Sequence, residues 1–190
     1  MKGKHTELGS RKISVRKFIC DQVPVLNYWY NEEGMYSLRL VKKDDLETLS
    51  KIFSDSFTNI SPDKPWEQKY ALEYLKYWFE KQPDMFLCAC DDNDNLVGAI
   101  ATNIKPWRTG MRCTDGVVFV DINFQKRGIA TLLLKEIISK AKDKYGVEIF
   151  EAITFSEKEF PLTWYEKIGL SVDKGAVVIK GNCKDLLEKL

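Results

Sequence analysis

The sequence predicts one mixed α/β (α+β) domain, and three observations support this fold class. From Tyr36 onward, apolar strand-like runs alternate with segments of helical periodicity. The 190 residues are 44% hydrophobic and 30% charged, which is typical of a globular chain long enough for a sizeable core. The sequence has no internal repeat and no linker, so a single domain of packed sheet and helices is the economical interpretation.

Residues 1–35 differ from the rest and are predicted to form an N-terminal extension of a domain that covers residues 36–190. Basic side chains outnumber acidic ones in the first part of this segment. We expect a tail or a short docked helix, because a nucleic-acid or lipid contact would need denser charge or an aromatic ladder. Tyr28, Trp29 and Tyr30 are expected to pack on the main body, since three adjacent exposed aromatic side chains would be a liability.

The domain begins with a strand and an amphipathic helix. Residues 37–41 alternate between polar and apolar side chains, as a half-buried strand does. Asp44 or Asp45 caps the helix that follows, which runs to about residue 57. The apolar side chains of this helix recur at helical spacing and form one face: Leu46, Leu49, Ile52, Phe53 and Phe57.

A second helix and a hairpin come next. Pro65 suits the first turn of the helix, which ends at about Lys81. Its aromatic residues recur every four positions, a spacing that predicts core packing and also suits the wall of a substrate pocket: Trp66, Tyr70, Tyr74 and Trp78. Apolar runs at 85–90 and 96–101 flank an acidic turn and predict a β-hairpin. The turn lacks the glycine and the distal glutamate of a calcium loop.

The second half of the domain alternates strands and helices. A loop over residues 105–113 is expected to lead into a strand over residues 115–121. The predicted elements after it are a helix over 129–145, a strand over 148–155, a short helix over 160–168, closing strands over 170–172 and 176–179, and a terminal helix over 184–190.

Residues 125–130 predict an anion site between a strand and a helix. The free N–H groups of the first helical turn and the helix dipole both favour negative charge at this point. Gly128 lets the backbone approach a phosphate without a side chain in the way, and Lys126 and Arg127 add two cations. The local chemistry therefore predicts a phosphate-bearing ligand.

Charge, hydropathy and cysteine use exclude several classes of function. The net charge is +1, so no global field attracts nucleic acid or an anionic membrane. No apolar run approaches the ~20 residues of a membrane span, and the N-terminus lacks the apolar core of a secretory signal. The five cysteines are expected to be free thiols in a reducing, cytoplasmic compartment, with Cys88 and Cys90 in the core. The one histidine, His5, argues against Cys-His or Ser-His chemistry and against a histidine-based zinc site, and no metal is expected.

The order of elements resembles the GNAT superfamily of N-acetyltransferases over most of the chain. The signature of that family, Q/R-x-x-G-x-G/A, lies between its fourth strand and third helix, and Gln125, Gly128 and Ala130 match it in that context. A tyrosine followed by a glycine and an apolar residue is a second recurring feature of the family, matched here by Tyr165 and Gly169. An asparagine and an alanine that often precede this tyrosine are replaced by Lys158 and Pro161.

The resemblance implies a mixed, mostly antiparallel central sheet of about six to seven strands flanked by helices. It also implies acetyl-CoA, or a related acyl-CoA, as cosubstrate. The pyrophosphate would lie on the N–H groups of the anion site, and the peptide-like pantetheine arm would lie beside the preceding strand, where the fourth and fifth strands of the family splay apart. The residues it assigns to the cosubstrate are Val118, Phe119, Val120, Gln125, Lys126, Arg127, Gly128, Ile129, Ala130 and Thr131.

The implied reaction is direct attack of a primary amine on the thioester within a ternary complex. An alkyl amine with a pKa of ~10 must first lose a proton, and the departing thiolate benefits from a proton donor. The resemblance assigns the second task to Tyr165 and the first to Glu151, with Asp115 and Asp121 as alternatives. Cys113 is the alternative nucleophile for a ping-pong route.

The acceptor is the least specified part of the reaction. Four aromatic residues are predicted to line its site, which favours an apolar or aromatic amine or a cation held over ring faces: Trp66, Tyr70, Trp78 and Trp107. Small-molecule amines, peptide N-termini and protein lysines stay open as acceptors, and a homodimer stays open as the assembly. The alternative function is a non-catalytic acyl-CoA-binding sensor. A nucleotide-binding α/β protein is a further one, although the sequence lacks both GxGxxG and GxxxxGK[ST].

Overall fold

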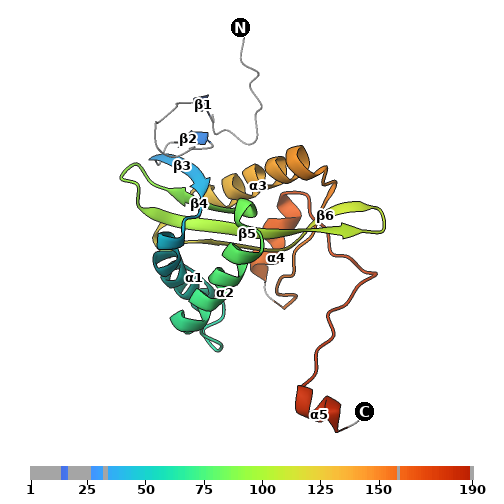
Figure 1. Ribbon diagram of the computed structural model, residues 1–190. Helices are drawn as coiled ribbons and strands as arrows, with labels where there is room; N and C mark the ends of the chain where they lie inside the picture. Colours follow the sequence, from blue (N-terminus) through green and yellow to red (C-terminus); the bar gives the residue numbers. More distant parts are fainter. Residues whose placement is uncertain (1–13, 17–26, 32–33, 158, 189–190) are drawn as a thin grey trace. The chain divides into compact units, whose positions relative to one another are not determined.

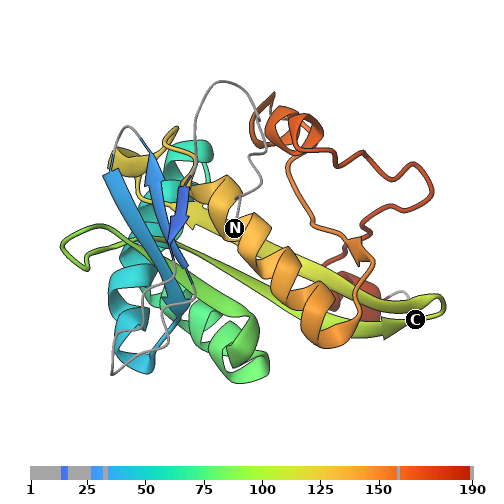
Figure 2. The ribbon, with the colours of Figure 1, turned by 90° about the horizontal axis from the view of Figure 1, so that it is seen from above.

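The computed structural model describes residues 14–16, 27–31, 34–157 and 159–188 (Figure 1, Figure 2). The chain divides into two compact units, Met1–Ala152 and Ile153–Leu190. The first unit contains a sheet with helices packed on it. The second contains the helices α4 (Glu159–Lys167) and α5 (Cys183–Leu187).

Within the described residues, seven strands form one sheet in chain order (Figure 1). They are β1 (Ser14–Arg16), β2 (Asn27–Asn31), β3 (Gly34–Leu40), β4 (Phe86–Cys90), β5 (Leu96–Trp107), β6 (Gly110–Val120) and β7 (Ile149–Phe150). Neighbouring strands pair antiparallel, except that β6 and β7 are parallel. Because β1 and β7 have only 3 and 2 residues, the main body of the sheet is β2–β6. The predicted mixed fold with a mostly antiparallel sheet is confirmed.

Helices cover both faces of this sheet. The helices α1 (Leu46–Ile60) and α2 (Gln68–Lys81) lie on one face, and α3 (Ile129–Tyr145) lies on the other (Figure 1, Figure 2). Every residue of β4 is consequently buried, and its sequence is a continuous apolar run rather than an alternating one. In the described part of the chain, three short 3₁₀ helices connect the elements: η1 (Lys43–Asp45), η2 (Pro83–Met85) and η3 (Ile122–Phe124).

The core beneath α1 and α2 contains the residues that the periodicity selected. The predicted apolar face of the first helix is buried, with Leu49 and Phe53 at its centre. Cys88 and Cys90 are 0% exposed in the same cluster, which confirms them as core residues. The predicted β4–β5 hairpin is also confirmed, and its turn is closed by the Asp91 carboxylate, which accepts hydrogen bonds from the Asn93 and Asn95 N–H groups.

A buried ion pair ties β3 to the start of α1. Arg39 donates two hydrogen bonds to the Asp45 carboxylate, at 2.6 and 2.9 Å, and the two side chains are 10% and 11% exposed. Burial alone would raise the pKa of Asp45. The hydrogen bonds from Arg39 and from the Lys42 N–H group outweigh burial and hold this pKa below its ordinary value. The pair therefore stabilises the entry into the first helix.

A second network holds the C-terminal end of α3. The Asp84 carboxylate in η2 accepts hydrogen bonds from the Tyr145 hydroxyl at 2.6 Å and from Lys144 Nζ at 2.8 Å. Burial would raise the pKa of Asp84, but these donors, with Gln82, lower it to about 2. Gly146 ends the helix with a φ of 65°, as predicted for its stop.

The predicted loop over residues 105–113 is wrong, because β5 and β6 continue through it as a long hairpin. Lys105 pairs with Arg112, and Trp107 pairs with Gly110 across the turn. The segment contains charged side chains and Pro106 in place of an apolar run, so the alternation expected of a strand was hidden. This hairpin carries part of the candidate site.

The predicted strands near the C-terminus are also corrected. The strand expected over residues 148–155 is reduced to the two residues of β7, and residues 170–172 and 176–179 are not strands. Val177 and Ile179 are 84% and 89% exposed. Branched apolar side chains favour strands, but a strand also needs a hydrogen-bonded neighbour, which these segments lack among the described residues. The predicted short helix and terminal helix are confirmed by α4 and α5.

Part of the predicted N-terminal extension, including His5 and Cys20, lies outside the described residues, as does Lys158. Two described parts of residues 1–35 are strands, since β1 pairs with β2 and β2 pairs with β3. The side chains of Tyr28, Trp29 and Tyr30 are outside the described set. The boundary at residue 35 remains a prediction.

Candidate active site

The loop between β6 and α3 is fixed by side chains at its two ends. Asp121 Oδ1 accepts hydrogen bonds from the Asn123 N–H group at 2.8 Å and from Asn123 Nδ2 at 3.0 Å. Gln125 Nε2 donates to the Val120 carbonyl at 3.1 Å, which folds the loop back on the end of its own strand. Gln125 thus shapes the loop from which the N-terminus of α3 projects.

The backbone of this loop presents donors to one side. Lys126 and Gly128 have φ values of 64° and 83°, while Arg127 between them has a negative φ, an alternation that turns successive N–H groups the same way. The first helical hydrogen bond runs from the Leu132 N–H group to the Gly128 carbonyl at 3.0 Å. The N–H groups of the preceding turn are therefore left over at the helix N-terminus.

Space and charge at this N-terminus suit an anion. A Cβ atom at Gly128 would meet nothing within 4 Å, so the approach to the N–H groups is open. Lys126 is exposed, and the Arg127 guanidinium donates to the Asn123 carbonyl at 2.9 Å while lying 4.9 Å from the Phe124 ring centroid. The anion site predicted from residues 125–130 thus has the helix N-terminus, the open backbone and the positive charge that it requires.

The strand that leads to this loop has an open edge. β6 pairs with β5 along its length, but with β7 only at Arg112 and Cys113, where the Glu151 N–H group adds one bond to the Cys113 carbonyl at 2.8 Å. Among the described residues, 114–120 have no strand on that side. Phe119 and Val120 are buried and Val118 is half-buried, so the backbone of this edge, more than its side chains, is what a ligand would meet. An unpaired strand edge binds extended chains that carry amide groups.

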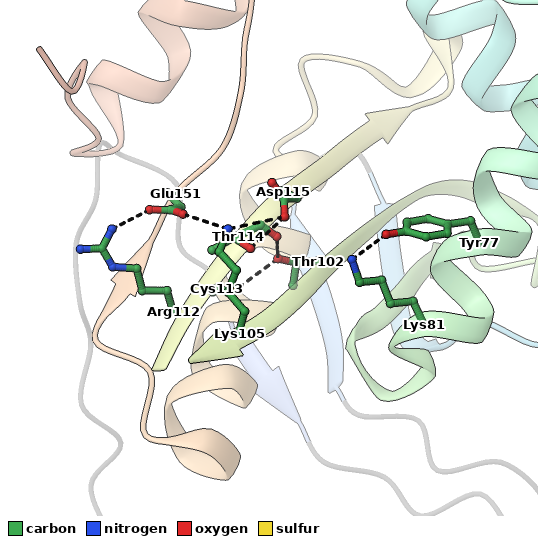
Figure 3. Close-up of polar contacts among 9 residues, drawn as sticks. All are labelled: Tyr77, Lys81, Thr102, Lys105, Arg112, Cys113, Thr114, Asp115 and Glu151. Atoms are coloured by element: carbon green, nitrogen blue, oxygen red, sulfur yellow. Dashed lines mark hydrogen bonds and ion pairs between the residues drawn. The ribbon is translucent and has the colours of Figure 1, made fainter. Parts of the chain in front are cut away.

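Four charged residues form a cluster where β6 leaves β7, and we call Lys105, Arg112, Asp115 and Glu151 the hairpin cluster (Figure 3). Arg112 Nη1 donates to Glu151 Oε2 at 2.9 Å, and Lys105 Nζ lies 3.8 Å from Glu151 Oε1 and 4.0 Å from Asp115 Oδ2. The two cations also lie over the Trp107 ring, at 5.5 Å for Lys105 and 5.0 Å for Arg112. The cluster thus brings the predicted base Glu151 beside its alternative Asp115.

Asp115 lies at a bulge in β6. The register with β5 shifts between Ala101 and Asn103, and Asp115 has a φ of 58° at this point. Its Oδ2 accepts a hydrogen bond from Thr114 Oγ1 at 3.0 Å, and its side chain is 45% exposed. A bulge re-aims a side chain relative to the strand, and it is a frequent feature beside active sites.

Cys113 has the environment of a buried structural residue. Its side chain is 0% exposed and its sulfur lies 3.1 Å from Thr102 Oγ1 (Figure 3). Burial raises the pKa of the Cys113 thiol to about 11. Since the thiolate is the nucleophile, this environment disfavours the ping-pong route that the sequence left open.

Tyr165 lies in α4, in the second unit, and is 9% exposed. Burial raises the pKa of its phenol, so the hydroxyl stays protonated at neutral pH and can donate a hydrogen bond. Its carbonyl accepts hydrogen bonds from the Ile168 and Leu170 N–H groups near the end of α4.

The four aromatic residues predicted for the acceptor site occupy different environments. Trp78 is 3% exposed in the core, and Trp66 packs edge-on against Phe53 at 5.0 Å. Tyr70 is 57% exposed on α2, and Trp107 is 45% exposed at the end of the β5–β6 hairpin. The aromatic stripe is therefore partly core, as its spacing predicted, and of the four residues Trp107 is the one that contacts side chains of the hairpin cluster.

Sequence reasoning missed Lys105 and Arg112, because it placed both in a loop. The one available signal was the basic–aromatic sequence around Trp107, which precedes a turn and is followed by Arg112. Among the described residues, no group of three or more His, Cys, Asp or Glu side chains is arranged to hold a metal ion. The helices of the same residues include none with the length and hydropathy needed to cross a membrane.

Comparisons with known proteins bear on this geometry. Residues 46–170 match the acetyltransferase (GNAT) family. A curated relative, the uncharacterized N-acetyltransferase MJ1207 of Methanocaldococcus jannaschii, is 28% identical over 156 residues, which cover 80% of this chain. The chain spans 66% of the length of that relative.

Solved structures share the fold at low identity. A possible acetyltransferase from Clostridium difficile 630 aligns with a TM-score of 0.64 at 16% identity, over 77% of this chain and 98% of its own. A predicted acetyltransferase from Clostridium acetobutylicum, solved with acetyl-CoA, aligns with a TM-score of 0.61 at 16% identity, over 81% of this chain and 98% of its own. At such identities the likeness shows the fold alone.

Proposed function

Because the chain belongs to the GNAT acetyltransferase family, we propose that it transfers an acetyl group from acetyl-CoA to a primary amine by direct attack within a ternary complex. The observation that carries this proposal is the N-terminus of α3, where left-handed backbone at Lys126 and Gly128 and an open approach meet the unpaired N–H groups of a helix. Such a site favours a phosphate-bearing donor.

On the donor side, the pyrophosphate is proposed to accept hydrogen bonds from the N–H groups of the loop and of the first helical turn, Ile129, Ala130 and Thr131. Lys126 and Arg127 add positive charge. The pantetheine arm is proposed to lie along the open edge of β6 beside Val118, Phe119 and Val120, with its two amide groups in the place of a strand. The related protein solved with acetyl-CoA supports this choice of donor.

On the acceptor side, a primary amine attacks the thioester carbon. We propose that Tyr165 gives a proton or hydrogen bond to the departing thiolate, because its buried phenol stays protonated. A carboxylate of the hairpin cluster, Glu151 or Asp115, takes a proton from the amine. Trp107, beside this cluster, is proposed to contact the acceptor, and the roles of Trp66, Tyr70 and Trp78 in acceptor binding stay predictions.

Two measurements test the proposal. Thermal unfolding with CoA, acetyl-CoA, ATP and NAD should show stabilisation by the first two and not by the last two. Release of CoA thiol from acetyl-CoA across a panel of small amines and peptide N-termini should then depend on both the amine and the protein. Stabilisation by acetyl-CoA without thiol release across the panel would favour a sensor, and no stabilisation by CoA would refute the donor site.

A further inference from the structure

We propose that Asp115 is the residue that takes the proton from the acceptor amine, and that Glu151 is a positioning residue for the hairpin cluster. This inference rests on the proposed acetyl transfer and identifies the base within it.

Glu151 has both carboxylate oxygens engaged by cations. Oε2 accepts a hydrogen bond from Arg112 Nη1 at 2.9 Å, and Oε1 lies 3.8 Å from Lys105 Nζ. The positive charge of these two side chains beside the carboxylate opposes the approach of a substrate ammonium to Glu151. The same two contacts join the end of β7 to the β5–β6 hairpin, which is a structural task.

Only one oxygen of the Asp115 carboxylate has contacts within the described residues. Its contacts within the described part of the chain both fall on Oδ2, with Thr114 Oγ1 at 3.0 Å and Lys105 Nζ at 4.0 Å (Figure 3). Oδ1 is left for a substrate, and the side chain is 45% exposed. The positive φ of Asp115 belongs to the small set of strained conformations that concentrate at functional sites, and aspartate tolerates it better than most residues.

The position of Asp115 along β6 matches the reach of the donor. The open edge of β6 runs back from Val120. The loop between β6 and α3, which carries the proposed anion site, follows directly after Val120. The pantetheine arm has as many main-chain bonds as about four residues, an extended length of roughly 13 Å. Four residues back from Val120 is Gly116, the neighbour of Asp115. The thioester would therefore lie where the bulge re-aims this carboxylate.

Charged and titratable groups reach Asp115 from three elements. Lys105 comes from β5, and Glu151, at the end of β7, shares that same lysine. Tyr74 comes from α2: burial raises the pKa of its phenol, and the charge of Asp115 raises it further. Tyr74 thus stays protonated within electrostatic reach of Asp115. Because Lys105 is divided between two carboxylates, Asp115 is not neutralised by a cation of its own.

The proton balance of the step is complete with these groups. The acceptor ammonium gives one proton to Asp115, directly or through water, and this proton leaves to solvent. The amine nitrogen then forms the C–N bond as the C–S bond breaks. The Tyr165 phenol gives a proton to the departing thiolate, and the second proton of the amine nitrogen restores the phenol. The sum is ammonium plus acetyl-CoA giving amide, CoA thiol and one released proton.

The test compares Asp115→Asn with Glu151→Gln in the full chain, using an alkyl amine found by the thiol-release screen. Asparagine tolerates the left-handed backbone of position 115, so the fold is kept, and thermal unfolding with acetyl-CoA checks this for both variants. We expect Asp115→Asn to lower kcat about 100-fold at pH 7, with an acetyl-CoA KM within about 2-fold of the parent, since general bases contribute 10²–10⁴-fold. This loss should shrink as the pH rises toward the amine pKa of ~10, because the free amine no longer needs a base.

Glu151→Gln should instead lower kcat by less than about 10-fold, by a factor that does not change with pH, and should lower the unfolding temperature. The inference is overturned if Asp115→Asn keeps the parental kcat, if its loss is the same at every pH, or if Glu151→Gln shows the pH-dependent loss. Parental protein that binds acetyl-CoA but releases no thiol with any amine would overturn the proposed function first, and this inference with it.

Discussion

Two glycines at opposite ends of α3 provide a matched test of the anion site. Gly128 has a φ of 83° at the start of the helix and Gly146 a φ of 65° just after its end. At neither position would an added Cβ meet an atom within 4 Å. Replacing either by alanine therefore places a side chain in left-handed backbone without a clash, which costs about 1–2 kcal/mol. Each variant should lose ~2–4 °C in unfolding temperature per kcal/mol for a chain of this size.

The two substitutions should differ in acetyl-CoA binding. A methyl group at Gly128 would fill open space at the N-terminus of α3, through which the phosphate is proposed to approach the N–H groups. Loss of one charge-assisted hydrogen bond costs about 1.5–3 kcal/mol, which corresponds to roughly a 10- to 100-fold rise in Kd. Gly128→Ala should show this rise in calorimetric titration with acetyl-CoA, and Gly146→Ala should bind like the parent. Equal affinities for the two variants would refute the assignment of the phosphate to this helix N-terminus.

Three further predictions concern catalysis and stability. Tyr165→Phe should lower kcat by ~10-fold or more with little change in acetyl-CoA affinity, and an unchanged kcat under conditions where chemistry is rate-limiting would exclude a proton-donating role. Asp45→Ala should lower the free energy of unfolding by about 3 kcal/mol in urea titrations, because it leaves Arg39 buried without its carboxylate partner. As a control, removing the exposed carboxylate of Asp55 should cost under ~0.5 kcal/mol. Similar losses for the two variants would contradict a stabilising role of the buried ion pair. Since the pKa of Asp84 is lowered to about 2, its contribution to stability is complete above the unfolded pKa of ~3.9 and is lost as the pH falls toward 2. Asp84→Asn should therefore flatten the dependence of the unfolding free energy on pH in this range. An unchanged slope would argue against the network at the end of α3.

The strand–loop–helix geometry around residues 125–130 could be predicted from sequence because six consecutive residues carry its signal, and the binding of an anion there stays a prediction. Strand, glycine and helix follow one another there, and the chemistry of a helix N-terminus depends on local backbone alone. The apolar face of α1 and the core position of Cys88 could be predicted for a similar reason, since each follows from the repeat of a single element.

The hairpin cluster could not be predicted in this way. Lys105 lies in β5, Arg112 lies in β6 and Glu151 directly follows β7. They meet only through the β5–β6 register and the parallel pairing of β6 with β7. A shift of one residue in either register would turn a side chain to the other face of the sheet. The bulge at Asp115 is itself such a shift, and its one local signal is Gly116, since a glycine inside a strand pattern often accompanies a bulge.

The strands predicted over residues 170–172 and 176–179 are not formed, for a different physical reason. Residues 176–179 have the branched apolar side chains that strands favour, and they are nonetheless exposed. Strand propensity measures how well a side chain fits a pleated, half-buried surface, and it is expressed only where a neighbouring strand supplies that surface. Propensity read along one segment contains no information about its partner.

The open edge of β6 also has a consequence for the protein without its ligand. Unpaired N–H and C=O groups along a flat strand edge are a template on which the strand of another molecule can pair, and such edges promote self-association. Within the described residues, 117–120, which follow the bulge at Asp115, form such an edge with no strand beside it. A donor whose arm carries two amide groups would satisfy the same backbone positions. The cosubstrate would then act as a protective cover for the sheet between turnovers, and its cellular supply would bear on the solubility of the protein as well as on its rate.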